Sequence, residues 1–152
     1  ARWHGASQKV GQSAAPLFLD RIDIQCEITP VPFKDISKAA PGEPSANIRE
    51  RVIKAREIQA ARYKDYKGIH CNAQMTERMI HQFAEPNEAG IDMLRMAMEK
   101  LSLTARAYSR ILKVARTIAD LEGCEHVELH HLAEAIGYRA LDRGDWAERG
   151  HI

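Results

Sequence analysis

Two arginines stand where a guanidinium could act on phosphate groups. Arg21 lies in the stretch LDRID (residues 19–23), where three charges interrupt an otherwise apolar segment. Charged side chains rarely enter a core unless they are paired or contact a ligand. One interpretation is an ion pair from Arg21 to Asp20 or Asp23 at a strand end. The other is recognition of an anion, because a planar guanidinium matches phosphate oxygens with two hydrogen bonds.

Arg106 follows Thr104, a residue type that begins helices, and so falls in the first turn of an expected helix. The positive end of the helix dipole disfavours a cation at this position, which indicates a purpose outside the helix. Arg110 and Lys113 lie on the same face, four and seven residues further on. For these two residues we prefer a solvated helix face as the interpretation.

Cysteine and histidine patterns do not favour a metal site or a disulfide framework. The three cysteines are Cys26, Cys71 and Cys124, an odd number without C-x-x-C spacing. We expect buried thiols in a reducing compartment, the cytoplasm. The seven histidines include His130 and His131 but lack the two tight ligand pairs typical of structural zinc, so we expect no metal. Around Cys71 no base or nucleophile partner is evident, and a packing role is expected for residues 68–75.

Length and charge restrict the function classes. The chain has 152 residues, which is enough for one domain with an attached arm. Its net charge is only +1, so it has no strong positive electrostatic field of the kind that indicates a nucleic-acid binder. No apolar run is long enough to span a bilayer, so no membrane partner is expected. Residues 45–67 carry seven basic and three acidic side chains, for which we prefer a solvated face over a phosphate-facing surface. A G-x-x-x-x-G-K-[ST] phosphate loop is absent from the sequence.

The elements that must position these residues are mainly helical. Alternation predicts one strand over residues 17–28, with Ile22, Ile24, Cys26 and Ile28 on one face, followed by a proline-rich connector. Helices are then predicted over residues 45–64, 72–84, from 87, from 105 to 122 and over 129–142. Ser45 or Asn47 would cap the first helix, whose inner face would carry Ile48, Val52 and Ala55. The helix over residues 105–122 has an apolar stripe at helical spacing: Tyr108, Ile111, Leu112, Ala115, Ile118 and Ala119. A single strand has no ladder partner, so we interpret it as an orphan from a sheet upstream in a longer protein.

These motifs resemble the magnesium-chelatase-like AAA+ ATPases, and most closely their ComM-like branch, bacterial proteins implicated in DNA processing. The resemblance covers about residues 16–143 and rests on LDRID (19–23), GIHCNAQM (68–75), TARAYSRILKVARTIADLEG (104–123) and HLAEAI (131–136) with Tyr138-Arg139. The family usually approaches the first arginine through SGPLLDR, whereas this chain reads SAAPLFLDR over residues 13–21, which leaves the local path before Asp20 open.

The resemblance implies a division of the chain. Residues 1–15 would be a disordered arm or a non-native remnant, and residues 16–44 the last strand of an α/β ATPase core with its connector. Residues 45–143 would form the helical lid, a bundle of about five helices, and residues 144–152 a tail. The phosphate loop and the acidic residue that coordinates magnesium would lie upstream, so the chain alone is expected neither to bind nor to hydrolyse ATP.

The resemblance also gives both arginines a role. Arg21 would be an arginine finger that reaches nucleotide in the neighbouring subunit of a ring, usually a hexamer, and Arg106 would be a sensor arginine that contacts the γ-phosphate. The full-length protein would use ATP and Mg²⁺ and act on DNA. Two alternatives stay open: the lid of a chelatase subunit that inserts metal into porphyrin, and a stand-alone helical module that binds DNA through residues 45–67. The stand-alone module does not explain the orphan strand.

Overall fold

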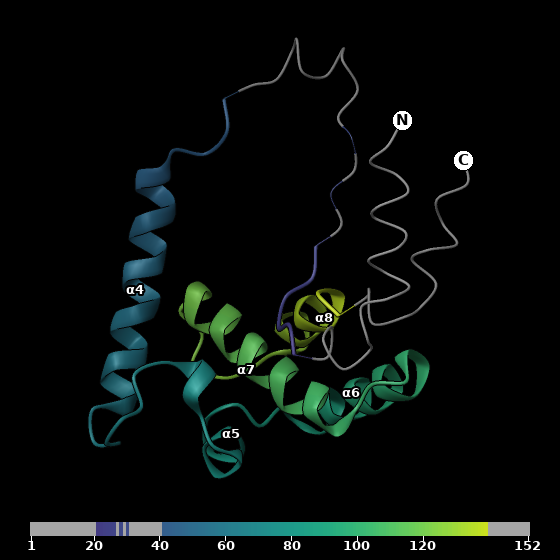
Figure 1. The fold of residues 1–152 in the computed structure, drawn as a ribbon. Coiled ribbons are helices and arrows are strands. Elements are labelled where there is room, and N and C mark those ends of the chain that lie inside the picture. Colours follow the sequence, from purple (N-terminus) through teal and green to yellow (C-terminus); the bar gives the residue numbers. More distant parts are fainter. Residues whose placement is uncertain (1–20, 27, 29, 31–40, 140–152) are drawn as a thin grey trace.

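The structure, a computed structural model, describes residues 21–26, 28, 30 and 41–139 (Figure 1). In this part of the chain the regular elements are α4 (Ser45–Tyr63), the 3-10 turn η1 (Asn72–Gln74), α5 (Glu77–Phe83), α6 (Glu88–Leu101), α7 (Ala105–Glu122) and α8 (Leu129–Gly137). The prediction of a mainly helical bundle with about five helices is confirmed. The arm 1–15, most of the connector and the tail 144–152 lie outside the described residues.

Helix α7 is the centre of the bundle, and α4, η1, α5 and α8 all pack against it. Its buried side chains recur at helical spacing: Ala107, Ile111, Leu112, Ala115, Ile118 and Ala119. All of these residues except Ala107 were predicted, and the predicted stripe also included Tyr108, which proves to be half-buried. Because burial of one Leu or Ile side chain contributes about 1.5–3 kcal/mol, the stripe supplies much of the force that holds the bundle together.

The ends of α7 are set by the residues that the sequence indicates. The Thr104 hydroxyl accepts a hydrogen bond from the Ala107 amide at 3.2 Å. At the other end Gly123 adopts a left-handed conformation with φ 74°, and the amide of Cys124 bonds the carbonyl of Ala119 at 2.8 Å. The helices after Thr76 and Asn87 begin with the same kind of side-chain cap.

Close approach of α6 and α8 depends on a glycine. A Cβ at Gly90 would lie 2.7 Å from the Cβ of Pro86 and 2.8 Å from Cδ1 of Leu132. Both distances are shorter than van der Waals contact, so a larger side chain would push the α6–α8 pair apart.

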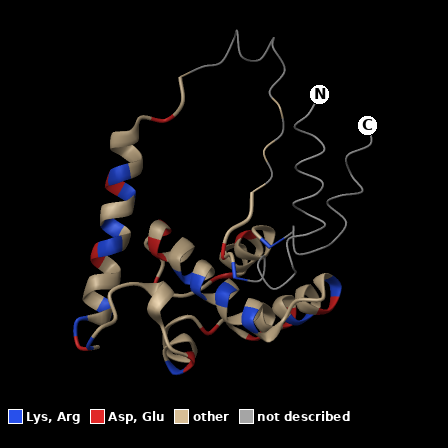
Figure 2. Cartoon of the chain, viewed as in Figure 1, with Lys and Arg blue, Asp and Glu red and all other residues tan. Residues whose placement is uncertain are grey.

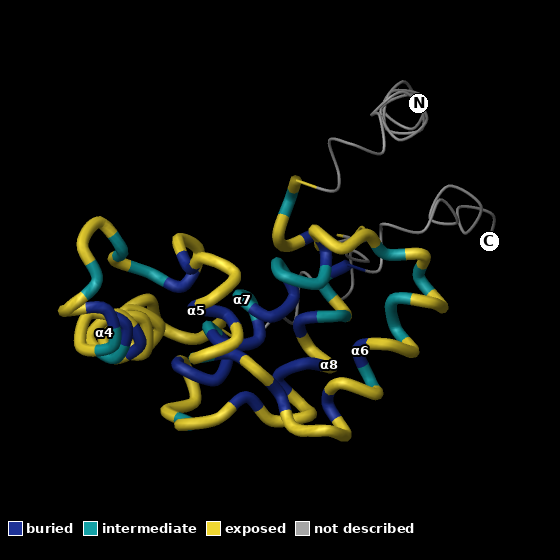
Figure 3. Tube along the Cα trace, turned by 90° about the horizontal axis from the view of Figure 1, so that it is seen from below, coloured by how far each residue is buried: buried dark blue, intermediate teal, exposed yellow. Residues whose placement is uncertain are grey.

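Helix α4 buries less of its predicted inner face than expected. Its first ten residues are exposed, and Figure 3 shows exposed positions around most of the helix. Ile48 and Val52, expected on the inner face, remain 44% and 46% exposed, whereas Ala55 is buried as expected. The N-cap is Pro44 without a side-chain hydrogen bond, so the expected caps at Ser45 or Asn47 are wrong. Only the second half of α4 meets α7, and that half alone has a face to bury.

The expected strand over residues 17–28 does not appear in its described part. Residues 21–26 and 28 have no regular structure, Gln25 is buried, and the predicted inner residues Ile24 and Cys26 are exposed. Among the described residues this segment has no strand to pair with, and the Gln25 amide instead donates to the Tyr138 carbonyl at 3.0 Å. Residues 17–20 lie outside the described ranges.

Two smaller expectations also change. Helix α8 ends at Gly137, before the predicted end at residue 142, although residues 140–142 themselves are not described. The cysteines are free, as expected, but Cys26 is exposed and Cys71 and Cys124 are only partly buried, so the prediction of buried thiols is wrong.

Among the described helices, none combines the length and the apolar character needed to cross a bilayer.

Candidate functional site

The segment that carries Arg21 lies against the bundle and is held there by two arginines. Nη1 of Arg110, on α7, donates to the Arg21 carbonyl at 2.9 Å and forms an ion pair with Asp23. Arg139, just after α8, donates through Nη1 to the Ile22 carbonyl. The segment therefore has a defined position without any strand ladder.

These contacts bear on one of the two interpretations of Arg21. Asp23 is paired with Arg110, so the expected alternative of an Arg21–Asp23 ion pair is not formed. Arg21 is exposed and makes no ion pair with a described residue, while Asp20 lies outside the described ranges. Within the described residues the side chain of Arg21 is therefore exposed, and an ion pair to Asp20 is the part of the alternative that stays open.

The preferred interpretation of Arg110 and Lys113 as a solvated face is wrong. Arg110 holds the Arg21 segment, and Nζ of Lys113 donates to the Ala73 carbonyl of η1 at 3.0 Å. Both side chains cross from α7 to a neighbouring segment. Periodicity places them on the exposed side of the helix but gives no information about segments that have no periodicity of their own.

Arg106 stays exposed in the first turn of α7. No described residue forms an ion pair with it, in contrast to Arg110 one turn further on, and the two side chains share a helix face. Figure 2 shows basic positions recurring along the visible side of α7. The structure therefore brings both predicted arginines to the same helix: Arg106 on α7 itself and Arg21 on a segment fastened to it.

A second group of arginines is buried around one carboxylate. Arg62, at the end of α4, donates to Oδ2 of Asp120 on α7 at 2.8 Å. Arg116 donates to Oδ1 of the same carboxylate at 3.1 Å through Nε, and its other nitrogens bond the carbonyls of Cys124 and Glu125. The Asp120 side chain is fully buried and that of Arg116 is 1% exposed. This ion triad joins α4, α7 and the loop after α7.

Asn72 completes the buried cluster and uses all of its side-chain hydrogen-bonding capacity. Its Nδ2 donates to Asp120 at 2.8 Å and to the Thr117 hydroxyl at 3.0 Å. Its Oδ1 accepts from Arg62 at 3.0 Å and from the Tyr63 hydroxyl at 2.7 Å. The packing role expected for residues 68–75 is confirmed for Asn72, which lies at the start of η1.

The two guanidiniums of this cluster share one carboxylate and are further compensated by hydrogen bonds. Hydrogen bonds to Asp120 raise the pKa of Arg62, while burial lowers the pKa of the more deeply placed Arg116. Burial also raises the pKa of the Tyr63 phenol. Because the Asp120 carboxylate and the Asn72 amide are engaged by neighbouring side chains, these groups are not free to bind a ligand. We assign the cluster to stability, and the sequence signal for it was the Arg116–Asp120 spacing of four residues.

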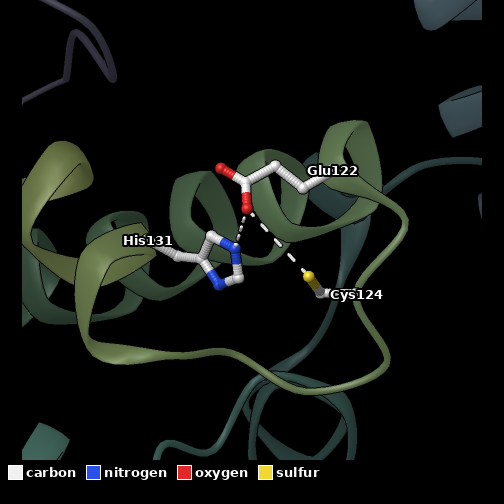
Figure 4. A group of neighbouring side chains, drawn as sticks. All are labelled: Glu122, Cys124 and His131. Atoms are coloured by element: carbon white, nitrogen blue, oxygen red, sulfur yellow. Dashed lines mark hydrogen bonds and ion pairs between the residues drawn. The ribbon is translucent and has the colours of Figure 1, made fainter.

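Glu122, Cys124 and His131 approach one another after α7 and could be mistaken for a metal site (Figure 4). Nδ1 of His131 accepts from the Glu128 amide at 2.9 Å, so the proton of the neutral ring lies on Nε2, which donates to Glu122 at 3.0 Å. If a metal ion were bound at Nε2, the proton of the neutral ring would have to move to Nδ1, where it would face the N–H of the Glu128 amide. The three side chains therefore do not fit a metal ion. His131 instead takes part in the cap of α8 through its hydrogen bond with the Glu128 amide.

Basic side chains on and after α4 form a separate surface. Arg51, Lys54 and Arg62 are paired with acidic residues. The remaining four of the seven form no ion pair with a described residue: Arg49, Arg56, Lys64 and Lys67. Three of them, Arg56, Lys64 and Lys67, line a groove of about 670 Å³ between α4 and the loop before η1.

Comparisons with known proteins give concordant results. Residues 42–139 match the family model described as magnesium chelatase, subunit ChlI C-terminal. The chain is 42% identical over 127 residues to competence protein ComM of Haemophilus influenzae, covering 83% of this chain and 24% of that protein. It is 40% identical to the uncharacterized protein YifB of Escherichia coli over the same shares. An uncharacterized protein of Mycobacterium tuberculosis is 32% identical over 130 residues. The chain thus spans about a quarter of the length of these curated relatives.

Proposed function

Because this chain belongs to the magnesium-chelatase-like ComM/YifB family, we propose that it is the helical lid region of an AAA+ ATPase. The observation that carries the proposal is the division of the motif arginines. Arg110 and Arg116 form ion pairs with described residues, whereas Arg21 and Arg106 remain exposed without an ion pair to any described residue. A lid needs guanidiniums of this second kind.

In the proposed ring, Arg21 acts on nucleotide held by the neighbouring subunit. Its exposed guanidinium would stabilise the charge that develops on the γ-phosphoryl group during transfer, an effect of order 10³–10⁵ in rate in arginine-finger systems. The planar fork suits two phosphate oxygens at once, so lysine would be a poorer substitute. The anchored backbone of residues 21–23 supports this role, because a finger must be placed accurately to contribute.

Arg106 would act on the nucleotide of its own subunit. It projects from the first turn of α7, the helix around which the bundle is packed. A contact between Arg106 and the γ-phosphate would therefore change the position of the whole bundle, not only of a loop. ATP and Mg²⁺ would be the cofactors of the full-length protein, with the triphosphate held by residues outside this sequence, which has no phosphate loop.

DNA is the proposed substrate of the ring. The supporting observation is the basic surface with Arg49, Arg56, Lys64 and Lys67, whose charges are not neutralised by described acidic residues. Contacts of this kind to phosphates are independent of sequence and weaken steeply with salt. The alternative function is metal insertion into porphyrin, for which the full-length protein would not bind DNA even at low salt. Measuring DNA binding by the full-length protein at low salt therefore separates the two functions.

Mixed rings of the full-length protein test the two arginines. Arg21→Ala should abolish ATP hydrolysis and leave nucleotide binding intact, because its target lies in the next subunit. Rings that combine Arg21→Ala subunits with phosphate-loop mutants should regain part of the activity, since some interfaces then pair an intact loop with an intact finger. Arg106→Ala acts on its own subunit and should weaken the response to the γ-phosphate. Mixed rings that assemble but stay inactive would refute the role of Arg21 in a neighbouring site.

A further inference from the structure

Arg110 contacts the backbone from which the Arg21 side chain departs. Its Nη1 donates to the Arg21 carbonyl at 2.9 Å and pairs with Asp23, two residues further on. One side chain on α7 therefore fixes two points of the segment on either side of Ile22. Arg110 keeps 31% of its side chain exposed, and Asp23 keeps 51%, so the contact lies at the surface and not in the core.

Two more hydrogen bonds fasten the same segment to the end of α8. Arg139 donates to the Ile22 carbonyl, and the Gln25 amide donates to the Tyr138 carbonyl at 3.0 Å. The segment has no regular secondary structure, so these contacts, and not a ladder, determine its position. Arg110 is the attachment to α7, and it lies one turn after Arg106 on the same helix face.

We infer that Arg110 is a positioning residue that joins Arg21 to the helix bearing Arg106, so that both arginines move as one body. This inference rests on the proposed function. A shift of α7 caused by nucleotide at Arg106 would then be transmitted through Arg110 to Arg21, and so to the nucleotide of the neighbouring subunit. The chain itself would link the occupancy of one site to the rate of hydrolysis at the next.

The inference predicts a specific kinetic signature. A misplacement of about 1 Å can reduce a rate by about 10²-fold, so loss of the Arg110 contact should lower kcat about 10- to 100-fold. KM for ATP should change little, because Arg110 does not touch the nucleotide. Exposed ion pairs contribute little to folding, so the variant should still assemble and retain its melting temperature.

The test uses the full-length protein with substitutions at both ends of the contact. Arg110→Ala removes both bonds, Asp23→Ala removes only one, and Arg110→Lys restores a charge without the fork. The expected order of kcat is wild type, then Asp23→Ala and Arg110→Lys, then Arg110→Ala. Arg95→Ala is the matched control, because it removes an exposed arginine–aspartate pair within α6 and should leave kcat unchanged.

A double variant and hydrogen exchange complete the design. Arg21→Ala with Arg110→Ala should have the kcat of Arg21→Ala alone, because Arg110 acts through Arg21, and residues 21–26 should exchange their amide hydrogens faster in Arg110→Ala. If Arg110→Ala keeps the wild-type kcat while Arg21→Ala is inactive, the inference is overturned and the proposed function is not. The inference is also overturned if the double variant has a kcat below that of Arg21→Ala alone, because Arg110 would then act independently of Arg21. Wild-type kcat in Arg21→Ala would instead refute the proposed function. In that case unchanged exchange in residues 21–26 would also overturn the attachment by Arg110.

Discussion

Two regions of α7 use arginine in opposite ways. Near its C-terminal end, Arg116 is buried against Asp120 and shares this carboxylate with Arg62 of α4. Near its N-terminal end, Arg106 is exposed and has no ion pair with a described residue. Arg106 and Arg116 lie ten positions apart on one helix, so helix propensity does not distinguish them, and the only local signal is the Asp120 four residues after Arg116.

The difference is one of hydrogen-bond and charge balance. A buried guanidinium is tolerated only when a carboxylate and several acceptors compensate for lost water, and a group compensated in this way has nothing left for a ligand. An exposed guanidinium keeps its hydration and stays available at little cost to folding. The buried region therefore determines stability, and the exposed region is where chemistry with an external anion can occur. The following predictions test that separation.

The largest effect on folding is expected for Asp120→Ala. This substitution leaves Arg116 buried without its carboxylate and removes the link between Arg62 and α7. Loss of one partner of a buried pair typically costs about 3–5 kcal/mol, so the free energy of unfolding should fall by that amount. Urea denaturation followed by circular dichroism measures it.

Asp92→Ala is the control for this experiment, because Asp92 pairs with Arg95 on the exposed side of α6. It should change the free energy of unfolding by less than about 1 kcal/mol. Equal losses in Asp92→Ala and Asp120→Ala would remove the basis for treating the buried region as the structural one.

Asn72→Ala should give the next largest effect. It removes four side-chain hydrogen bonds and leaves part of the buried Asp120 carboxylate without its donor. A buried polar group left unsatisfied costs about 1–3 kcal/mol, and the same urea titration should show a loss in that range. Asn72→Asp should be no less destabilising, because a second carboxylate would then face Asp120. A stability equal to that of the wild type would show that water replaces the amide.

Much of the helical frame follows from the sequence for local reasons. Thr76, Asn87 and Thr104 cap their helices, and Gly123 ends α7, because capping depends on residues only three or four positions apart. The apolar stripe of α7 follows from the helical period, since one side of the helix is covered by its neighbours. These features require no knowledge of which segments meet.

The contacts that define the two regions could not be predicted in this way. Arg62 and Asp120 are 58 residues apart, and Arg110 reaches Asp23 across 87 residues. Charge patterns along a helix do not indicate partners on other segments, so Arg110 was assigned to solvent. The extent of burial of α4 was wrong for the same reason: its predicted face was the correct one, but among the described residues only the second half of that face is covered. The roles of Arg21 and Arg106 stay predictions.

Arg21→Ala and Arg106→Ala should have almost no effect on folding. Neither guanidinium makes an ion pair with a described residue, so each substitution should change the free energy of unfolding by no more than about 0.5 kcal/mol. In the proposed function Arg21→Ala nevertheless loses ATP hydrolysis and Arg106→Ala weakens the response to the γ-phosphate, in contrast to Asp120→Ala, whose primary effect is on folding. Thermal denaturation of both variants is the measurement. A loss of several kcal/mol in either one would place that arginine with the structural group.

The smallest effect concerns Glu122, which lies at the boundary between the two kinds of region. Its exposed carboxylate accepts hydrogen bonds from His130 at 2.8 Å and from the buried His131 at 3.0 Å. These bonds hold the pKa of Glu122 below 4.5 in the folded state, with His130 as the first cause and His131 as the second. The unfolded chain then binds more protons than the folded chain as the pH falls through this window.

It follows that the contribution of Glu122 is present above pH 4.5 and is lost as the pH falls through the lowered pKa. Glu122→Gln should therefore flatten the acid side of the stability curve below pH 4.5 and slightly lower stability near pH 7, because the neutral amide lacks the contribution of the ionised carboxylate although its oxygen still accepts from His131. Glu99→Gln, on the exposed side of α6, is the matched control. Urea titrations at a series of pH values make the comparison. If Glu122→Gln keeps the acid dependence of the wild type, solvent screens this carboxylate fully, and it belongs with the exposed region despite its contact with a buried histidine.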